Sequence, residues 1–135
     1  MIQIYPQVEA GSAQTNALAW VTTTKGTELY EATDINDDTA TEMKTALQQQ
    51  SFGDAAFNST LTGLSICLQD GRRLEKIEFI DSAGGVVLTL QGNFRIPNKG
   101  KGGGVSAYYN FEAMGMSLPV TKGYTMKITT KDAQN

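Results

Sequence analysis

The stretch Lys76-Ile-Glu-Phe-Ile-Asp-Ser-Ala-Gly-Gly-Val-Val-Leu-Thr-Leu-Gln91 has the pattern of two β-strands joined by a tight loop. In its first half Ile77 and Phe79 alternate with Glu78, and successive side chains of a strand point to opposite faces of a sheet. The small residues 82–85 suit a turn, and the apolar run after them suits a partner strand. The stretch therefore predicts an antiparallel hairpin.

The same two-residue period recurs on both sides of this hairpin. We expect strands at residues 17–24, 27–32, 64–69, 105–111 and 124–129, and a short one at residues 2–4. Turn signals such as Lys25-Gly26 and Asp70-Gly71 separate them. About eight short strands with such turns indicate an all-β fold, a single jelly-roll-like β-sandwich. An immunoglobulin-like sandwich is the alternative, and a chain of 135 residues suits one domain, residues 1–135.

One stretch between these strands has a different period. Thr39 and Glu42 stand at the spacing of a capping box, in which a hydroxyl and a carboxylate satisfy free backbone groups at a helix start. Met43 and Leu47 then follow at a spacing of four, which places both on one face of a helix. We therefore expect one short α-helix at residues 39–50.

The N-terminal sequence, Met1-Ile-Gln-Ile-Tyr-Pro6, lacks the basic start and long apolar run of a signal peptide. No run in the chain approaches the roughly 20 apolar residues that span a bilayer, so we expect no transmembrane segment. Both features indicate synthesis in a cytoplasm. Because Pro6 ends the first strand pattern, residues 1–16 are expected to form an extended N-terminal arm.

Charge divides the chain into an acidic and a basic half, although the net charge is only −3. Residues 1–71 carry nine acids and two bases, whereas residues 72–135 carry five acids and nine bases. Two interpretations stay open: chance with local turn chemistry, or copies that attract one another head to tail in a closed ring. The net acidity also argues against sequence-specific binding to nucleic acid.

Residues that could support catalysis or metal binding are scarce. The chain has no His, which removes Ser-His-Asp and Cys-His arrangements and the commonest zinc ligand. Asp34-Ile-Asn-Asp-Asp38 begins like a calcium loop, but Thr39 stands where the turn needs Gly and Thr45 where ligation needs Glu. Glu75 and Glu78 lie among basic residues, which indicates a solvated strand rather than a catalytic pair. We therefore expect no enzyme, no catalytic residue, no metal and no cofactor.

A Gly-rich segment at residues 95–104 carries three positive charges, on Arg95, Lys99 and Lys101. It lacks the phosphate-loop motif, because the residue after Lys101 is Gly and not Ser or Thr. One interpretation is a mobile turn between strands. The other is a contact loop, in which these three residues touch a neighbouring subunit, a phosphate or a lipid headgroup.

Three aromatic residues follow this segment in the next expected strand. Alternation places Tyr109 and Phe111 in the core and Tyr108 on the outside. Tyr108 is therefore the candidate exposed aromatic residue, and an exposed ring could stack on a sugar.

The segment Leu118-Pro-Val-Thr-Lys-Gly-Tyr-Thr-Met-Lys-Ile-Thr-Thr130 contains a Pro that leads into a Gly turn, followed by an alternating strand. With the Thr- and Gly-rich composition and a charged fraction of only 19%, it resembles the closing strand of small jelly-roll capsid or penton (vertex) proteins of tailless icosahedral phages. The resemblance covers residues 118–130 and carries over no functional residue. It implies a five-fold or pseudo-six-fold ring of jelly rolls.

Composition and resemblance lead to two functional hypotheses. The first is a structural subunit of a virus particle, made in the host cytoplasm and located in the virion, that binds its own copies and other coat proteins. Its homo-oligomer would be a ring, with a pentamer as one arrangement, and the choice between penton, major coat protein and spike base stays open. The alternative is a carbohydrate-binding or host-recognition β-sandwich module with an exposed aromatic platform.

Overall fold

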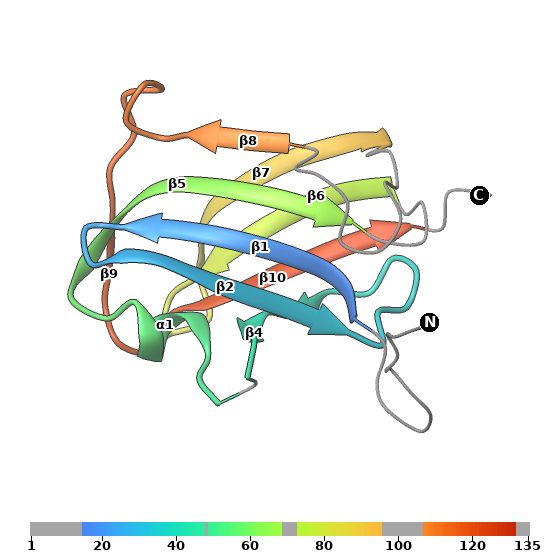
Figure 1. The fold of residues 1–135 in the computed structure, drawn as a ribbon, viewed down its shortest axis with the longest axis horizontal. Coiled ribbons are helices and arrows are strands. Elements are labelled where there is room, and N and C mark those ends of the chain that lie inside the picture. The colour runs from blue at the N-terminus through green and yellow to red at the C-terminus, as the bar shows by residue number, and fades with distance from the viewer. Residues whose placement is uncertain (1–14, 48, 69–72, 96–106, 132–135) are drawn as a thin grey trace, which may run out of the picture.

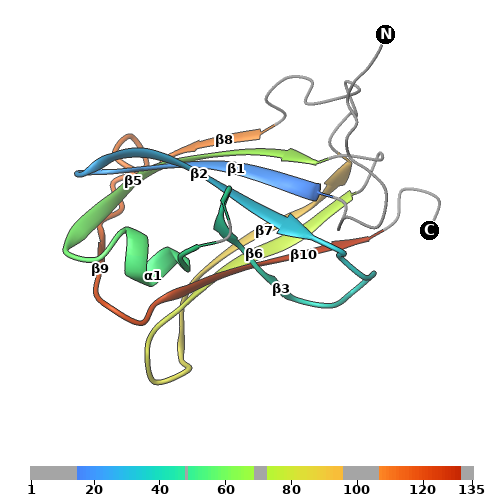
Figure 2. The ribbon, with the colours of Figure 1, turned by 60° about the horizontal axis from the view of Figure 1, so that its bottom comes forward.

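The computed structural model describes residues 15–47, 49–68, 73–95 and 107–131, which form two antiparallel sheets packed against each other (Figure 2). The larger sheet contains β1 (Thr15–Thr23), β2 (Gly26–Thr33), β4 (Lys44–Thr45), β5 (Ser59–Leu68), β8 (Ala107–Asn110) and β9 (Leu118–Val120). The smaller sheet contains β3 (Thr41–Glu42), β6 (Arg73–Ile80), β7 (Val86–Arg95) and β10 (Thr125–Lys131). One short helix, α1 (Phe52–Ala55), precedes β5 (Figure 1). The predicted all-β sandwich is confirmed.

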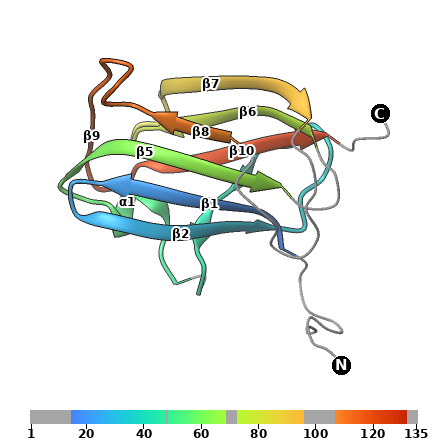
Figure 3. The ribbon, with the colours of Figure 1, turned by 45° about the horizontal axis from the view of Figure 1, so that its top comes forward.

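The order of strands in the larger sheet is β4-β2-β1-β5-β8, and β9 pairs with the remaining part of β5 (Figure 3). After an excursion through β3 and β4, the chain returns so that β5 lies beside β1. The resulting order β5-β1-β2-β4 is that of a Greek key. The smaller sheet has the order β3-β10-β6-β7, so the last strand of the chain lies inside it.

The prediction of a helix at residues 39–50 is wrong. Thr41–Glu42 pairs with β10 and Lys44–Thr45 pairs with β2, so the chain crosses from one sheet to the other at this point. Met43 between the two short strands is 0% exposed, whereas Leu47 is 76% exposed, so these residues do not share a face. The helix of the described chain lies instead at Phe52–Ala55, directly after this crossing.

The hairpin predicted at residues 76–91 is confirmed by the antiparallel pairing of β6 with β7. The strands expected at residues 17–24, 27–32, 64–69, 105–111 and 124–129 correspond, in their described parts, to β1, β2, β5, β8 and β10. The sequence pattern did not predict β9. The strand expected at residues 2–4 lies outside the described residues, as does most of the expected arm. Thr15 pairs with Thr33, so residues 15–16 belong to β1 and not to an arm.

Three aromatic rings connect the two sheets through the core. The rings of Tyr30 in β2 and Phe52 in α1 meet edge to face with centroids 5.9 Å apart, and the rings of Phe52 and Phe79 in β6 do so at 5.4 Å. All three residues are 0% exposed. Such edge-to-face pairs add stability beyond the burial of their area. The short helix α1 therefore delivers one large side chain into the space between the sheets.

Burial gives Tyr30 a role in the pH dependence of stability. Desolvation raises the pKa of the Tyr30 phenol well above its usual range, and the hydrogen bond that the phenol donates to Glu28 Oε1, 2.9 Å long, adds to the effect. The unfolded chain loses this proton near pH 10 and the folded chain does not. The free energy of unfolding is therefore intact below pH 10 and falls above it, by about 1.4 kcal/mol per pH unit for this group.

Tyr30→Phe is expected to make that alkaline decline shallower. Denaturant unfolding measured at intervals from pH 8 to pH 11 checks this prediction. The range extends on both sides of pH 10 because the ordinary pKa of tyrosine is about 10. Tyr108→Phe, which removes an exposed phenol, is the control and should leave the decline unchanged. An equal slope in Tyr30→Phe and the wild type would contradict the assignment.

Candidate functional site: the outer face of the larger sheet

β1 turns its small side chains toward the core and its large ones outward. Ala17 and Ala19 are 0% exposed, whereas Leu18 and Trp20, on the opposite side of the strand, are partly exposed. Alternation of side chains along a strand requires such a division once one set faces the core. The chain's only Trp therefore lies on the outside of the sandwich.

A row of four side chains crosses the larger sheet at this level. In the register, Leu29 of β2 stands opposite Trp20, Trp20 opposite Ser65 of β5, and Ser65 opposite Tyr108 of β8. Neighbouring strands lie about 4.8 Å apart, so the row is about 14 Å long. Tyr108 is 61% exposed. Two aromatic residues thus stand on either side of a small polar one.

A second row runs beside the first, from Thr27 through Thr22 and Gly63 to Asn110. The hydroxyls of Thr22 and Thr27 lie 2.9 Å apart and share a hydrogen bond. A Cβ atom at Gly63 would lie 3.4 Å from the phenol oxygen of Tyr108, so the Tyr108 ring leans toward Gly63. The low point between the two aromatic rings is therefore at Ser65.

We call the eight positions of these two rows the Trp20 face: Leu29, Trp20, Ser65, Tyr108, Thr27, Thr22, Gly63 and Asn110. None of them carries a charge. Charged side chains appear only beyond the rows, for example where Glu31 of β2 pairs in register with Lys44 of the edge strand β4. A surface without charge that presents Trp and Tyr has the composition found at the centres of protein interfaces.

The outer side of the smaller sheet has the opposite character. Ion pairs join Arg73 to Glu75 and Lys76 to Glu78, each at 3.5 Å, and Lys131 approaches Asp38 at 3.9 Å. Three basic residues of the second half of the chain, Arg73, Lys76 and Lys131, therefore have acids beside them. This local pairing favours the first of the two interpretations of the charge distribution, which needs no attraction between copies.

The sheet edges are poor places for a partner strand. The edge strands β3 and β4 are only two residues long, and on the far side of β5 the strands β8 and β9 have four and three residues. β7 has ten residues, but its pairing with β6 shifts register between Phe79 and Ile80 and again between Leu74 and Lys76, each time with an extra residue in β7. Short and bulged edges hinder strand addition. The described part of the molecule therefore offers a partner a face rather than an edge.

The predicted contact residues do not come together in the described structure. Tyr108 lies on the Trp20 face, whereas Arg95 is the last residue of β7, opposite Arg73 in the smaller sheet. Lys99 and Lys101 lie outside the described residues, so a contact loop at residues 95–104 stays a prediction.

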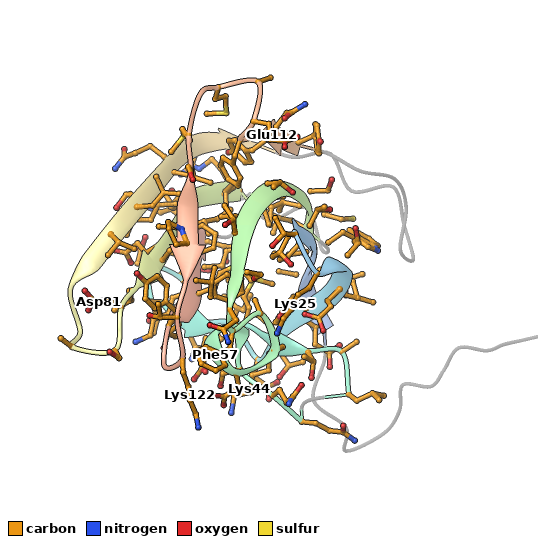
Figure 4. All side chains as sticks on the ribbon, turned by 90° about the vertical axis from the view of Figure 1, so that its left-hand side faces the viewer. Lys25, Lys44, Phe57, Asp81, Glu112 and Lys122 are labelled. Carbon is orange, nitrogen blue, oxygen red and sulfur yellow. The ribbon has the colours of Figure 1, made fainter. Side chains whose placement is uncertain are left out.

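The carboxylates of the β6–β7 hairpin have structural partners. Glu75 and Glu78 form the ion pairs given above, and Asp81 Oδ1 accepts hydrogen bonds from the backbone N–H groups of Ala83 and Gly85 in the loop. Figure 4 looks onto this end of the sandwich, where Asp81 and Glu112 lie far apart on its rim. Among the described residues, no three acidic or Cys side chains gather closely enough to hold a metal ion.

Comparison of the chain with protein-family models, with curated proteins and with solved structures finds no match in any of the three. Within the described ranges, no helix has the length and apolar character needed to cross a membrane.

Proposed function

We propose that the chain is a structural subunit of a virus particle that works by binding copies of itself and other coat proteins through the Trp20 face. The observation that carries this proposal is the uncharged row Leu29–Trp20–Ser65–Tyr108, which crosses four strands on the outside of the larger sheet. Interfaces between proteins are enriched in Trp and Tyr and depleted of charge at their centres. The protected sheet edges add support, because they leave the face as the place of contact.

A closed ring, with a pentamer as one arrangement, is part of the proposal for the assembled state. A ring joins two unlike patches on each copy, whereas a two-fold contact uses one patch twice. A contact of the Trp20 face with its own copy is of the second kind, so a ring requires two unlike patches elsewhere on the chain. The mass of the assembly in solution therefore distinguishes a ring from a pair.

Light scattering over a series of protein concentrations, at low and high salt, tests this function. The wild-type mass is expected to rise above that of the monomer with concentration, and an apolar contact should persist at high salt. Trp20→Glu places a charge in the contact and should weaken association by about tenfold or more. Thr89→Glu, on exposed β7 of the smaller sheet, is the matched control.

Assembly into particles needs its own measurement. Cells that express the chain together with the proteins encoded beside it should yield sedimenting particles that contain many copies of the chain. Loss of the Trp20→Glu variant from those particles is the expected result. Particles that incorporate Trp20→Glu as well as the wild type would refute the role of this face.

The exposure of Tyr108 in the same row as Trp20 favours a second function, carbohydrate recognition. Aromatic rings on a flat surface can stack on sugar rings, and the Ser65 hydroxyl between them can form hydrogen bonds. Because Trp20 is the only Trp, its fluorescence reports on this face alone. A saturable change on titration with oligosaccharides, lost in Tyr108→Ala, would support a binding module in place of a coat subunit.

A further inference from the structure

We infer that two copies of the chain pair through the Trp20 face about a two-fold axis that runs parallel to the strands, between β1 and β5. The inference rests on the proposed function, because it specifies the arrangement of a second copy on the same face. The inference specifies which residues of the two copies are in contact. The two-fold arrangement can therefore be tested separately from self-association.

The inference is based on how side-chain size varies along the row Leu29–Trp20–Ser65–Tyr108. Side-chain size along it runs medium, large, small, large. Rotation about the stated axis places β1 of one copy over β5 of the other, and β2 over β8. Trp20 then meets the low point at Ser65 of the second copy. Tyr108, whose ring leans toward Gly63, meets Leu29 and Thr22 of the second copy, which are both smaller. The face is thus complementary to itself in shape, as a two-fold contact requires.

Charge points to the same occupant. Identical surfaces repel each other where like charges meet, and the eight positions of the Trp20 face carry none. The outer side of the smaller sheet carries the ion pairs Arg73–Glu75 and Lys76–Glu78. Contact of this side with its own copy would bring like charges close together. The face that presents the aromatic residues is also the one that can meet its own copy without electrostatic cost.

The size of the face sets the expected strength. Strand spacing and residue rise give two rows over four strands an area on the order of 300 Å² per copy. Stable interfaces bury about 800 Å² per partner. The pair should therefore be weak in isolation, with a dissociation constant on the order of 0.1–1 mM. In a larger assembly, many such contacts would act together.

Exchange of the large and small residues tests the arrangement. Trp20→Ser leaves two facing recesses, and Ser65→Trp sets two large side chains against each other. Each single change is expected to lower the association constant, measured by sedimentation equilibrium, about tenfold or more. The double variant Trp20→Ser/Ser65→Trp moves the large side chain to the other partner position. It is expected to recover association to within about threefold of the wild type.

A cross-linking measurement does not depend on how well Ser65→Trp folds. Ser65→Cys should form a covalent dimer with a short bismaleimide, because the two Ser65 positions lie beside the axis. Thr89→Cys, which is exposed on the smaller sheet, is the matched control and should give no dimer above background. The unmodified chain, with its buried Cys67, sets that background.

The outcomes separate the two proposals. Recovery in the double variant together with cross-linking of Ser65→Cys supports the two-fold pair. Self-association of the wild type without either result overturns the two-fold arrangement and leaves self-assembly standing. A wild type that stays monomeric at millimolar concentration, with Ser65→Cys no more reactive than Thr89→Cys, overturns both.

Discussion

Phe52→Ala is expected to lower the free energy of unfolding by about 3–5 kcal/mol. Phe52 is 0% exposed, and its ring lies between those of Tyr30 and Phe79, in edge-to-face contact with both. Truncation removes buried apolar surface, breaks both ring contacts and leaves a cavity between the sheets. It also removes the one large side chain by which α1 enters this aromatic cluster. Denaturant unfolding followed by circular dichroism measures the loss.

Phe57→Ala is the matched control, since Phe57 is partly exposed and stands just after the same short helix. Its effect should be clearly smaller. Phe52→Leu, which keeps part of the volume, should give an intermediate loss and a folded protein if Phe52→Ala proves too unstable to measure. Equal losses for Phe52→Ala and Phe57→Ala would show that the aromatic cluster contributes little.

Gly53→Ala, one residue further on, should be almost as damaging although it adds only a methyl group. The backbone N–H of Gly53 donates a hydrogen bond of 2.8 Å to the carbonyl oxygen of Tyr124, so α1 and the turn before β10 touch backbone to backbone. A Cβ atom at Gly53 would overlap the backbone nitrogen and oxygen of Tyr124. Backbone atoms cannot rotate away as a side chain can. We expect a loss of about 3 kcal/mol or more.

Gly85→Ala provides the comparison for Gly53→Ala. Its added Cβ would come no closer than 3.4 Å to the Asp81 carboxylate, which is an ordinary van der Waals distance. The free energy of unfolding should therefore change by about 0.5 kcal/mol or less at Gly85. Thermal unfolding of the two variants checks the contrast. A Gly53→Ala variant as stable as Gly85→Ala would mean that α1 can shift away from Tyr124.

Alternation predicted the strands well because it reports a property of the strand itself. In β6 and β10, one set of side chains is apolar and the other polar, so the sequence also reveals which set is buried. β1 lacks this contrast. Ala17-Leu-Ala-Trp-Val21 is apolar on both sides, and size would suggest that Trp20 faces the core. The structure buries the alanines instead, because the large core side chains come from other strands.

Apolar residues on both faces of a strand were nevertheless a usable signal. Such a run indicates a strand that is covered on both sides, and for β1 a second copy on the Trp20 face is the cover that we propose. The register that places Ser65 between Trp20 and Tyr108 joins residues 45 and 43 positions apart. No local pattern contains that information. The apolar composition of the Trp20 face could therefore be predicted in part. The order of large and small side chains across its strands could not.

The expected helix at residues 39–50 failed for a related reason. The capping-box spacing at Thr39 and Glu42 is a local preference of a few residues. β10 and β2 each present an edge with unpaired backbone groups, and pairing with them satisfies the backbone of residues 41–45. Burial of Met43 at the crossing adds an apolar contribution that a surface helix would not have. Tertiary pairing thus outweighed local preference.

The position of β10 has a consequence for how the protein is made. This strand pairs with β6 on one side and with β3 on the other, so it holds together segments that are separated by more than 40 residues from it in the chain. Until residues 125–131 have left the ribosome, the smaller sheet lacks the strand between β3 and β6, and one side of the core stays uncovered. Native packing of the smaller sheet therefore waits for β10, and a chain that ends before Thr125 is expected to be degraded by proteases.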